Sequence, residues 1–362
     1  MDPFSQAALG AVVAQAAGHR TLGYRAAVYG ALAGALPDVD VLFSLNGDFV
    51  DQLVSHRGIT HSLFFAPVIG PALGWLIWYR EKMRREDPGP RHIWMWAITL
   101  ALLSHPLLDL LTPYGTQLML PFSDARFAVN AMPIIDPVYT GLLALGLFAA
   151  WLPPLRRHVP ASAVALLILT VSSTYLGYGW LQGVRTEAVA RAQLEAKGVV
   201  PSQLAAFPTI LQVHLRRVVA RTSTEDRVGF YSTWAPCEIE WQTAPRMRDR
   251  DRLGPFLASR EGRVFDWFTM GWARYDLQEA VNGLQLAVND LRYGFDDDPL
   301  SSIFSISAKL DPTGLPIQTL AAGQVGPQDP AGTFDRLVQE TYAPACRIFS
   351  RQTARPNDRT DS

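Results

Sequence analysis

Apolar and polar positions divide this sequence into two halves of different character. In the first half, long apolar segments recur at residues 63–79, 93–111, 138–152 and 160–181. From residue 184 onwards, apolar and polar positions alternate over short stretches separated by turn-forming residues. An apolar run of about 20 residues is long enough to cross a bilayer as a helix, whereas alternation with a period of two indicates strands. The pattern predicts a mainly α protein, in which a polytopic helical membrane domain precedes a smaller, strand-rich α+β domain.

The change of pattern also predicts the domain boundaries. We expect a helical membrane domain at residues 1–183, a soluble α+β domain at residues 184–350 and a disordered polar tail at residues 351–362. An amphipathic helix over residues 185–197 is expected to open the second domain. Strands are expected to include residues 212–216, 228–232 and 303–307.

Two shorter segments rich in small residues precede the long apolar ones and predict a pair of antiparallel helices. Asp2-Pro3 is typical of an N-cap followed by proline at the first helical position, and Gly18 is expected to end this helix. The second helix is expected at residues 21–36, where Gly30 and Gly34 allow close contact between helices. Since both helices are shorter than the ~20 residues of a full span, they are either tilted short spans or helices partly sunk beside the others.

Charge gives the predicted membrane domain an orientation. The net charge of the whole chain is −1, which gives no indication of a nucleic-acid partner. Residues 1–183 hold 11 of the 32 Lys and Arg, and nine of these 11 fall in connections at residues 20–25, 80–91 and 156–157. Because basic connections stay in the cytoplasm, these are expected inside. Residues 184–362 are then expected outside the cytoplasm of a multi-pass membrane protein.

The N-terminus and the cysteines bear on the compartment. Residues 1–3 lack a basic region, so no cleavable signal peptide is expected. The only two cysteines, Cys237 and Cys346, both lie in the polar half. They form one disulfide if that half faces an oxidising space, or they are two unrelated buried thiols.

Histidine and aspartate residues stand at the ends of the apolar segments, and the orientation places them all at the outer membrane face. Imidazole and carboxylate groups are ligands of zinc, and they also suit iron and manganese. The sequence therefore predicts a divalent metal site, with Zn²⁺ preferred and Mn²⁺ or Fe²⁺ as alternatives. The predicted ligands are Asp38, Asp40, His56, His61, His105 and Asp109.

The spacing of these residues supports metal binding more strongly for some of them than for others. His105 and Asp109 are one helical turn apart and share a face, although a helix-stabilising hydrogen bond or a packed pair would have the same spacing. Ionisable groups within spans are rare and usually functional, which favours ligation. His56 and His61 can converge if the first lies in a connection and the second in the first turn of a helix. Asp136 begins a further apolar segment at the same face.

The motifs that carry these residues resemble a family of membrane-bound metal-dependent hydrolases typified by the inner-membrane protein YdjM. The resemblance covers about the first 140 residues and includes Asp136-Pro137 only loosely. It is carried by Leu36-Pro37-Asp38-Val39-Asp40, His56-Arg57-Gly58-Ile59-Thr60-His61-Ser62 and Ser104-His105-Pro106-Leu107-Leu108-Asp109-Leu110-Leu111-Thr112-Pro113-Tyr114-Gly115. It implies a distant similarity to zinc-dependent phospholipase C and P1 nuclease, and hence metal-assisted hydrolysis of an ester.

One departure from the family's pattern bears directly on the predicted site. Members often open with Asp-Pro-x-Thr-His, whereas Gln6 stands here in place of the histidine. With antiparallel first helices, position 6 is expected near Asp38, where the resemblance implies a ligand. Glutamine offers a metal only a carbonyl oxygen, so the site is expected to hold fewer metals, to hold them weakly, or to be inactive.

We interpret the protein as a metal-dependent hydrolase of the bacterial inner membrane. A phosphoester or lipid-like ester is the expected substrate, because the site opens at the level of the lipid headgroups. Arg57 and Asp40 are the residues expected to act in catalysis; Arg57 either clamps an anionic group such as phosphate or contacts a headgroup. The alternative is a non-catalytic membrane scaffold whose metal pins its helices together. A transporter fits less well, because the predicted ligands lie at one face and not at the midplane.

Overall fold

A computed structural model gives the fold of the protein and describes residues 2–247, 251–280, 283–294, 300–324, 326 and 329–343. Cys346 and the predicted tail at residues 351–362 lie outside the described residues. The chain divides into two compact units. The first unit comprises residues 1–180 and 210–212, and the second comprises residues 181–209 and the chain from residue 213 onwards.

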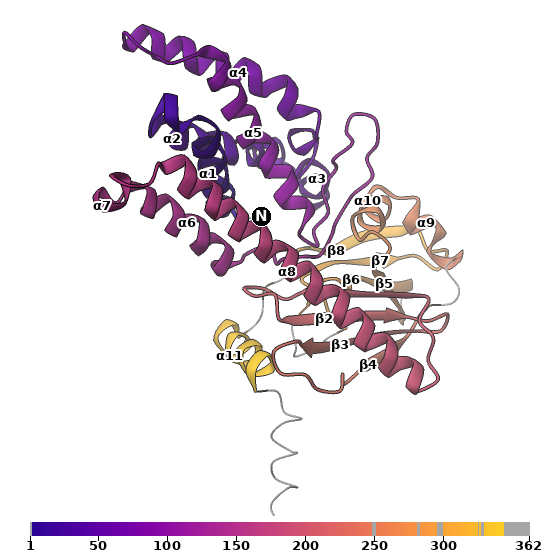
Figure 1. The fold of residues 1–362 in the computed structure, drawn as a ribbon. Coiled ribbons are helices and arrows are strands. Elements are labelled where there is room, and N and C mark those ends of the chain that lie inside the picture. Colours follow the sequence, from indigo (N-terminus) through magenta and orange to yellow (C-terminus); the bar gives the residue numbers. More distant parts are fainter. Residues whose placement is uncertain are drawn as a thin grey trace, which may run out of the picture. The chain divides into compact units, whose positions relative to one another are not determined.

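The first unit is built from helices (Figure 1). They are α1 (Pro3–Leu22), α2 (Arg25–Ala35), the 3₁₀ helix η1 (Leu36–Ser44), α3 (Phe49–Ser55), the 3₁₀ helix η2 (Ile59–His61), α4 (Phe65–Arg84), α5 (Arg91–Leu110), α6 (Pro137–Trp151) and α7 (Pro153–Arg156). The last helix, α8 (Ala161–Ala196), begins in the first unit and continues into the second.

Glycines allow α1 and α2 to pack closely against each other. A Cβ atom on Gly10 would lie 2.4 Å from the carbonyl oxygen of Gly30, and one on Gly34 would lie 2.5 Å from the carbonyl oxygen of Gln6. Real Cβ atoms do not come this close to backbone atoms, so a side chain at either position would separate the helices. The close contact predicted from Gly30 and Gly34 is confirmed.

The start of α1 agrees with the prediction, but its end does not. Asp2 caps it as expected, and its carboxylate accepts the N–H of Ser5 at 2.8 Å. The helix continues past Gly18 to Leu22, because a single glycine inside a helix costs only about 1 kcal/mol. It ends at Gly23, whose φ of +63° favours glycine.

Within the described residues, three helical segments are long and apolar enough to cross a membrane: Arg25–Ser44, Arg91–Leu110 and Ala161–Ala196. A fourth results if the bent pair Phe49–His61 and Phe65–Arg84, whose axes differ by 64°, forms one span. The prediction of a helical region with several candidate membrane helices is confirmed.

The junction between the two halves differs from the prediction. The apolar segment at residues 160–181 and the amphipathic helix predicted at residues 185–197 form one continuous helix, α8. The sequence between Pro160 and Pro201 contains no proline that would interrupt the helical hydrogen bonds. The change from apolar to amphipathic character therefore does not break the helix.

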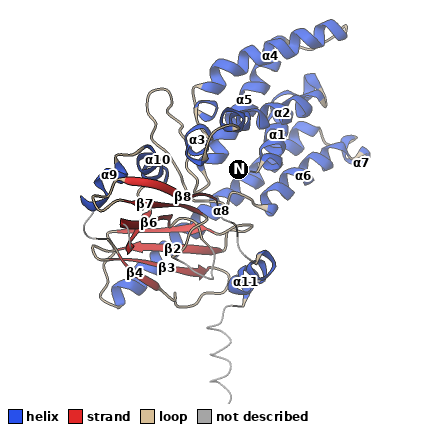
Figure 2. Cartoon of the chain, turned by 180° about the vertical axis from the view of Figure 1, so that it is seen from behind, coloured by secondary structure: helices blue, strands red, loops and turns tan. Residues whose placement is uncertain are grey.

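The second unit contains two four-stranded antiparallel sheets, in which sequential strands are neighbours (Figure 2). The first sheet has β1 (Gln203–Pro208), β2 (Leu215–Arg221), β3 (Glu225–Ser232) and β4 (Gln242–Pro245). The second has β5 (Ala273–Ala280), β6 (Gly283–Asp290), β7 (Phe304–Leu310) and β8 (Pro316–Gln324). The helices are η3 (Asp251–Leu253), α9 (Gly254–Leu257), α10 (Arg260–Phe268) and α11 (Pro330–Tyr342). The prediction of a strand-rich second part is confirmed.

The strand β2 is buried along its whole length, although the alternation of its residues predicted one exposed face. Val218 packs against Ala190 of α8, and the next residue, Val219, packs on the other face against Leu291. Both faces of this inner strand are therefore covered. The strand begins at Leu215, so only the last two residues of the strand predicted at residues 212–216 belong to it.

Candidate metal centre

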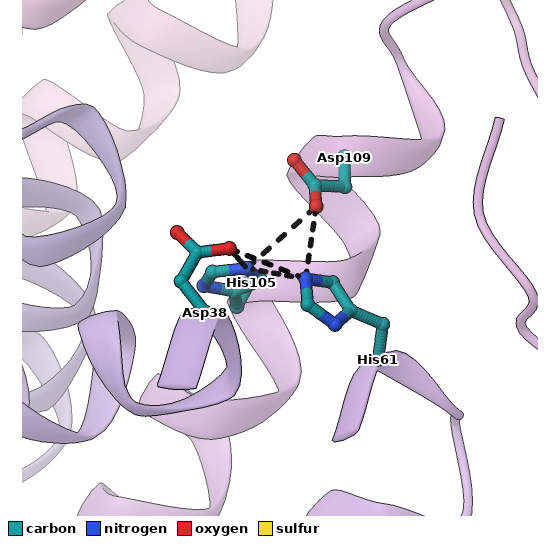
Figure 3. A group of neighbouring side chains, drawn as sticks. All are labelled: Asp38, His61, His105 and Asp109. Atoms are coloured by element: carbon teal, nitrogen blue, oxygen red, sulfur yellow. Dashed lines mark hydrogen bonds and ion pairs between the residues drawn. The ribbon is translucent and has the colours of Figure 1, made fainter. Parts of the chain in front are cut away.

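Four side chains converge within the first unit and form a cluster that we call the His–Asp cluster (Figure 3). Asp38 comes from η1, His61 from η2, and His105 and Asp109 from α5. One ligand atom of each lies within 4.8 Å of the others. The Nε2 atoms of His61 and His105 are 2.9 Å apart. Asp109 Oδ2 is 3.2 Å from His61 Nε2, and Asp38 Oδ1 is 3.3 Å from His105 Nε2.

The outer contacts of the two imidazoles determine which ring nitrogen carries the proton. His105 Nδ1 lies 2.6 Å from the carbonyl oxygen of Gly34, and His61 Nδ1 lies 3.1 Å from Oδ2 of Asp40. A carbonyl and a carboxylate oxygen can only accept, so each Nδ1 donates its proton outwards. In a neutral ring each Nε2 then keeps its lone pair. These lone pairs face one another and two carboxylate oxygens.

This arrangement fits a divalent metal ion. Acceptor atoms packed so closely repel one another unless a positive charge lies between them. A tetrahedral metal with bonds of ~2.0–2.2 Å holds its ligand atoms ~3.3–3.6 Å apart. The five separations that involve a histidine nitrogen run from 2.9 to 3.6 Å, and the two carboxylate oxygens lie within 4.8 Å of each other. Two imidazoles and two carboxylates form a donor set suited to zinc, manganese or iron.

Asp40, predicted as a ligand, lies behind His61. Its Oδ2 accepts the backbone N–H of Arg57 at 2.9 Å and the hydroxyl of Thr60 at 3.0 Å, besides the ring N–H of His61. Its Oδ1 lies 3.1 Å from Nδ1 of His56. A carboxylate that accepts the outer N–H of a histidine fixes the ring for metal binding. Asp40 is therefore placed to orient His61.

His56 lies at the half-buried side of the cluster. Together with Asp38 and Asp40 it forms a second group whose ligand atoms lie within 4.8 Å of one another. The two groups share Asp38. The structure thus assembles four of the six predicted ligands around one point and places Asp40 and His56 beside them.

Arg57 is buried, with only 1% of its surface exposed. Its Nε lies 3.1 Å from Oδ2 of Asp109, its Nη1 donates to the Thr112 hydroxyl at 2.7 Å, and its guanidinium lies over the Tyr114 ring at 4.7 Å. The surrounding residues enclose the guanidinium, so neither of the two alternatives for Arg57, a clamp on an anionic group or a contact with a lipid headgroup, can form without movement of these residues. Its charge is placed to balance that of Asp109.

Gln6 lies beside the cluster, as the antiparallel arrangement of α1 and α2 predicted. Its Nε2 donates to Oδ1 of Asp109 at 3.1 Å, and its side chain is fully buried. Its side-chain amide thus bonds to Asp109, whereas the sequence placed position 6 near Asp38. The backbone carbonyl of Gln6 meanwhile packs closely on Gly34 of α2, while the side chain reaches α5.

Asp136, expected at the same face, is a helix cap. Its Oδ1 accepts the N–H groups of Val138 and Tyr139 at 3.0 Å each, and its Oδ2 accepts the Tyr175 hydroxyl at 2.8 Å. These bonds occupy both carboxylate oxygens at the start of α6. Asp136 is not among the predicted ligands, and in the structure it serves the α6 N-terminus, which needs a capping acceptor at this position.

Sequence reasoning missed several supporting groups. Thr60 and Thr112 bond to Asp40 and Arg57, and both lie within the motifs that carry the ligands. Their position next to ligands was a usable signal. The carbonyl of Gly34, which orients His105, has no sequence signal, because every residue carries a carbonyl group.

Comparison with known proteins identifies the family of the chain. A family model described as YdjM inner membrane protein matches residues 1–185, which contain the whole His–Asp cluster. The chain belongs to the YdjM inner membrane protein family. This confirms the family predicted from the motifs.

Two curated relatives match parts of the chain. The uncharacterized protein YfhP of Bacillus subtilis (strain 168) is 32% identical over 124 residues, which are 33% of this chain and 35% of that protein. The inner membrane protein YbcI of Escherichia coli (strain K12) is 39% identical over 103 residues, 27% of this chain and 54% of that protein. The matches thus span about a third and about half of the lengths of these relatives. No solved structure matches the chain, so the similarity to phospholipase C and P1 nuclease stays a prediction.

Proposed function

We propose that this YdjM-family protein is a metal-dependent hydrolase of a phosphoester or lipid-like ester. Its own residues supply the ligands and fix their direction, and Zn²⁺ is the preferred ion, with Mn²⁺ or Fe²⁺ as alternatives. A divalent ion bound there would supply Lewis acidity and activate water for attack on the ester.

The unequal support of the four ligands carries this proposal. His61 is held by Asp40, His105 by the Gly34 carbonyl, and Asp109 by Gln6 and Arg57. The side chains of these three ligands are fully buried, whereas that of Asp38 is 18% exposed. Oδ1 of Asp38 is itself buried, so the exposed part of this side chain lies away from its ligand atom. Three braced ligands and one on the open side are typical of a catalytic site, in which substrate or water takes the fourth position.

Asp40 and Arg57 would then act in catalysis through the ligands they touch. Asp40 holds the His61 ring so that Nε2 faces inwards. Arg57 balances the charge of Asp109 and keeps its Oδ2 directed at the cluster. Because Arg57 is enclosed, a direct clamp on an anionic substrate would require movement around Tyr114, which covers its guanidinium.

The surroundings of Asp38 support a lipid-like ester. A 3₁₀ helix has three residues per turn, so Val39, Leu42 and Leu45 line up along η1 and its end. All three are exposed, and Val39 and Leu42 belong to a candidate membrane span. An apolar stripe beside the partly exposed ligand suits a substrate with hydrocarbon chains.

We further propose that the cluster and the second unit lie on the outer side of the inner membrane. The basic connections at residues 80–92 and 154–159 would then be cytoplasmic. Reporters fused after residue 343 test this orientation. A reporter that is active only in the cytoplasm should be silent there, and activity would overturn the orientation.

A metal-stabilised scaffold is the second candidate, and one observation favours it. All four positions of a tetrahedral centre can be filled by protein side chains, and three of these are fully buried, as in closed structural sites. Asp38 separates the two functions, because only a catalytic site needs this ligand to be replaceable.

The test measures metal content and ester hydrolysis in the same purified preparations. On the hydrolase proposal, the Asp38→Ala protein keeps about one metal per chain, held by the other three ligands. The rate at which it hydrolyses the substrate differs from that of the wild type. His61→Ala loses both. His92→Ala, at an exposed histidine on the same helix as His105, is the control and should change neither. A wild type that binds metal but hydrolyses no member of a phosphoester and lipid panel, together with metal loss in Asp38→Ala, would favour the scaffold.

A further inference from the structure

We propose that Gln6 is a positioning residue of the metal site, which restrains Asp109 to present one oxygen to the metal. This inference rests on the metal binding proposed above, but it does not depend on hydrolysis. It concerns a residue that stands where the family resemblance implies a ligand.

The contacts of Gln6 fix the orientation of its amide group. Nε2 lies 3.1 Å from Oδ1 of Asp109 and 3.4 Å from the carbonyl oxygen of His105. Both of these oxygens can only accept, so the NH₂ group must face them. The opposite orientation would place the amide oxygen against two acceptors. Oε1 therefore points away from them, and it is buried without a hydrogen-bond partner among the described residues.

This amide separates the functions of the two Asp109 oxygens. Oδ1 accepts from Gln6, whereas Oδ2 lies 3.2 Å from His61 Nε2 and 3.6 Å from His105 Nε2. Arg57 Nε, 3.1 Å from Oδ2, restrains the carboxylate from the other side. A carboxylate held in this way binds a metal through one oxygen. Without the amide, Oδ1 could turn inwards as a second ligand atom and raise the coordination number.

The packing of α1 gives Gln6 the rigidity that this function needs. The side chain is fully buried. Its backbone carbonyl is so close to Gly34 that a Cβ there would lie 2.5 Å away. The same Gly34 accepts the N–H of His105 through its own carbonyl. One tight helix contact therefore positions the supports of two ligands, so a shift of α1 would disturb both.

Gln15 offers a matched control on the same helix. Its side chain is 1% exposed, and its Nε2 donates to the carbonyl oxygen of Ala161 at 3.2 Å. Gln15→Met and Gln6→Met each replace a buried amide on α1 by an apolar side chain of similar length. Both leave a buried carbonyl oxygen short of one donor, but only the second removes a contact to a metal ligand.

The experiment titrates Co²⁺ into the full-length protein in detergent and records the visible spectrum and the Kd. Gln6→Met should weaken Co²⁺ binding by ~10–100-fold, the range for residues that support ligands. Its visible absorption should become weaker, as is typical of Co²⁺ with a higher coordination number. Gln15→Met should leave the Kd and the spectrum as in the wild type.

Gln6→Glu distinguishes positioning from direct ligation. If Oε1 of Gln6 were a ligand, a carboxylate at this position would bind Co²⁺ more tightly. If Gln6 positions Asp109, the variant has no N–H donor and sets a negative charge against Oδ1, so binding should weaken. Tighter binding by Gln6→Glu would overturn the proposal, as would a folded Gln6→Met protein with the wild-type Kd and spectrum. Equal losses in Gln6→Met and Gln15→Met would also overturn it and indicate helix packing alone.

The wild type separates this inference from the proposed function. A wild type that binds no Co²⁺, Zn²⁺ or Mn²⁺ would end both proposals, because there would be no metal to position. A wild type that binds Co²⁺ but hydrolyses no ester would end the hydrolase proposal only. The three variants would still decide the function of Gln6.

Discussion

Both units of the protein bury charged side chains, and those of the His–Asp cluster are neutralised differently from the ion pairs of the second unit. In the second unit, Arg292 donates to both oxygens of Asp290 over 2.6–3.1 Å, and Arg221 pairs with Asp226 at 2.8 Å. Each aspartate there has its own cation. In the first unit, two imidazole nitrogens and two carboxylate oxygens face one another, and Arg57 is the cation paired with Asp109.

The contrast distinguishes buried charges that stabilise the fold from buried charges that are arranged to bind a metal. Where every carboxylate is matched by a guanidinium, the charges balance, and no group of acceptors is left facing one another for a metal to join. A group of acceptors is costly to bury unless a cation joins it. Burial alone therefore does not identify the candidate centre; the excess of acceptors over donors does.

The largest expected effect comes from breaking a pair in the second unit. Arg292→Met leaves Asp290 buried without its guanidinium, which should lower the free energy of unfolding by ~3–5 kcal/mol. The loss should appear in chemical denaturation and in faster amide exchange of β6, while metal content stays unchanged. Arg227→Met is the control, because its pair with Glu225 is partly exposed and should contribute at most ~1 kcal/mol. A change in metal stoichiometry in Arg292→Met would contradict the separation of the two charge systems.

A slightly smaller effect is expected from removing a ligand of the His–Asp cluster. His105→Ala should weaken metal binding by ~10²–10³-fold, since structural zinc sites gain ~10–16 kcal/mol from about four ligands. Elemental analysis and competition with a chelator measure this. A proton shared by the two Nε2 atoms of His61 and His105 is the alternative that would satisfy the cluster without metal. It would be indicated by wild-type protein that stays metal-free in the presence of Zn²⁺, Mn²⁺ and Fe²⁺.

The smallest effect is expected from Asp40, which touches a ligand through its outer nitrogen. Asp40→Ala should weaken metal binding by ~10–100-fold, because His61 loses the acceptor that orients its ring. Isothermal titration of the metal-free protein gives the affinity, and the number of sites should stay the same. A loss as large as that of His105→Ala would indicate that Asp40 is itself a ligand.

Much of the fold follows from local features of the sequence. The length and spacing of the apolar segments predict helices, because a helix in a bilayer must be apolar over about 20 residues. Gly30 and Gly34 predict a close helix contact, since only a missing side chain permits it. The spacing of His105 and Asp109 predicts one shared face on α5, which is a property of the helical repeat.

Which of two neighbouring candidate ligands lies at the metal site depends on the tertiary structure. Asp38 and Asp40 are two residues apart, and on the 3₁₀ helix η1 their side chains point ~120° apart, so they cannot serve the site in the same way. The sequence could not predict this 3₁₀ geometry from composition. Whether a candidate aspartate contributes to the site or to a helix end depends on the donors that surround it, as Asp136 shows.

The sequence by itself determined the residue types, the membrane character and the spacing within each motif, because these depend on positions close together in the chain. Only the tertiary structure decided that Asp38, His61, His105 and Asp109 meet at one point, with Gln6, Asp40 and Arg57 behind them. The physical reason is that a site is defined by side-chain directions. These directions are set by contacts between distant segments, such as the one between Gly34 and Gln6, which no local pattern specifies.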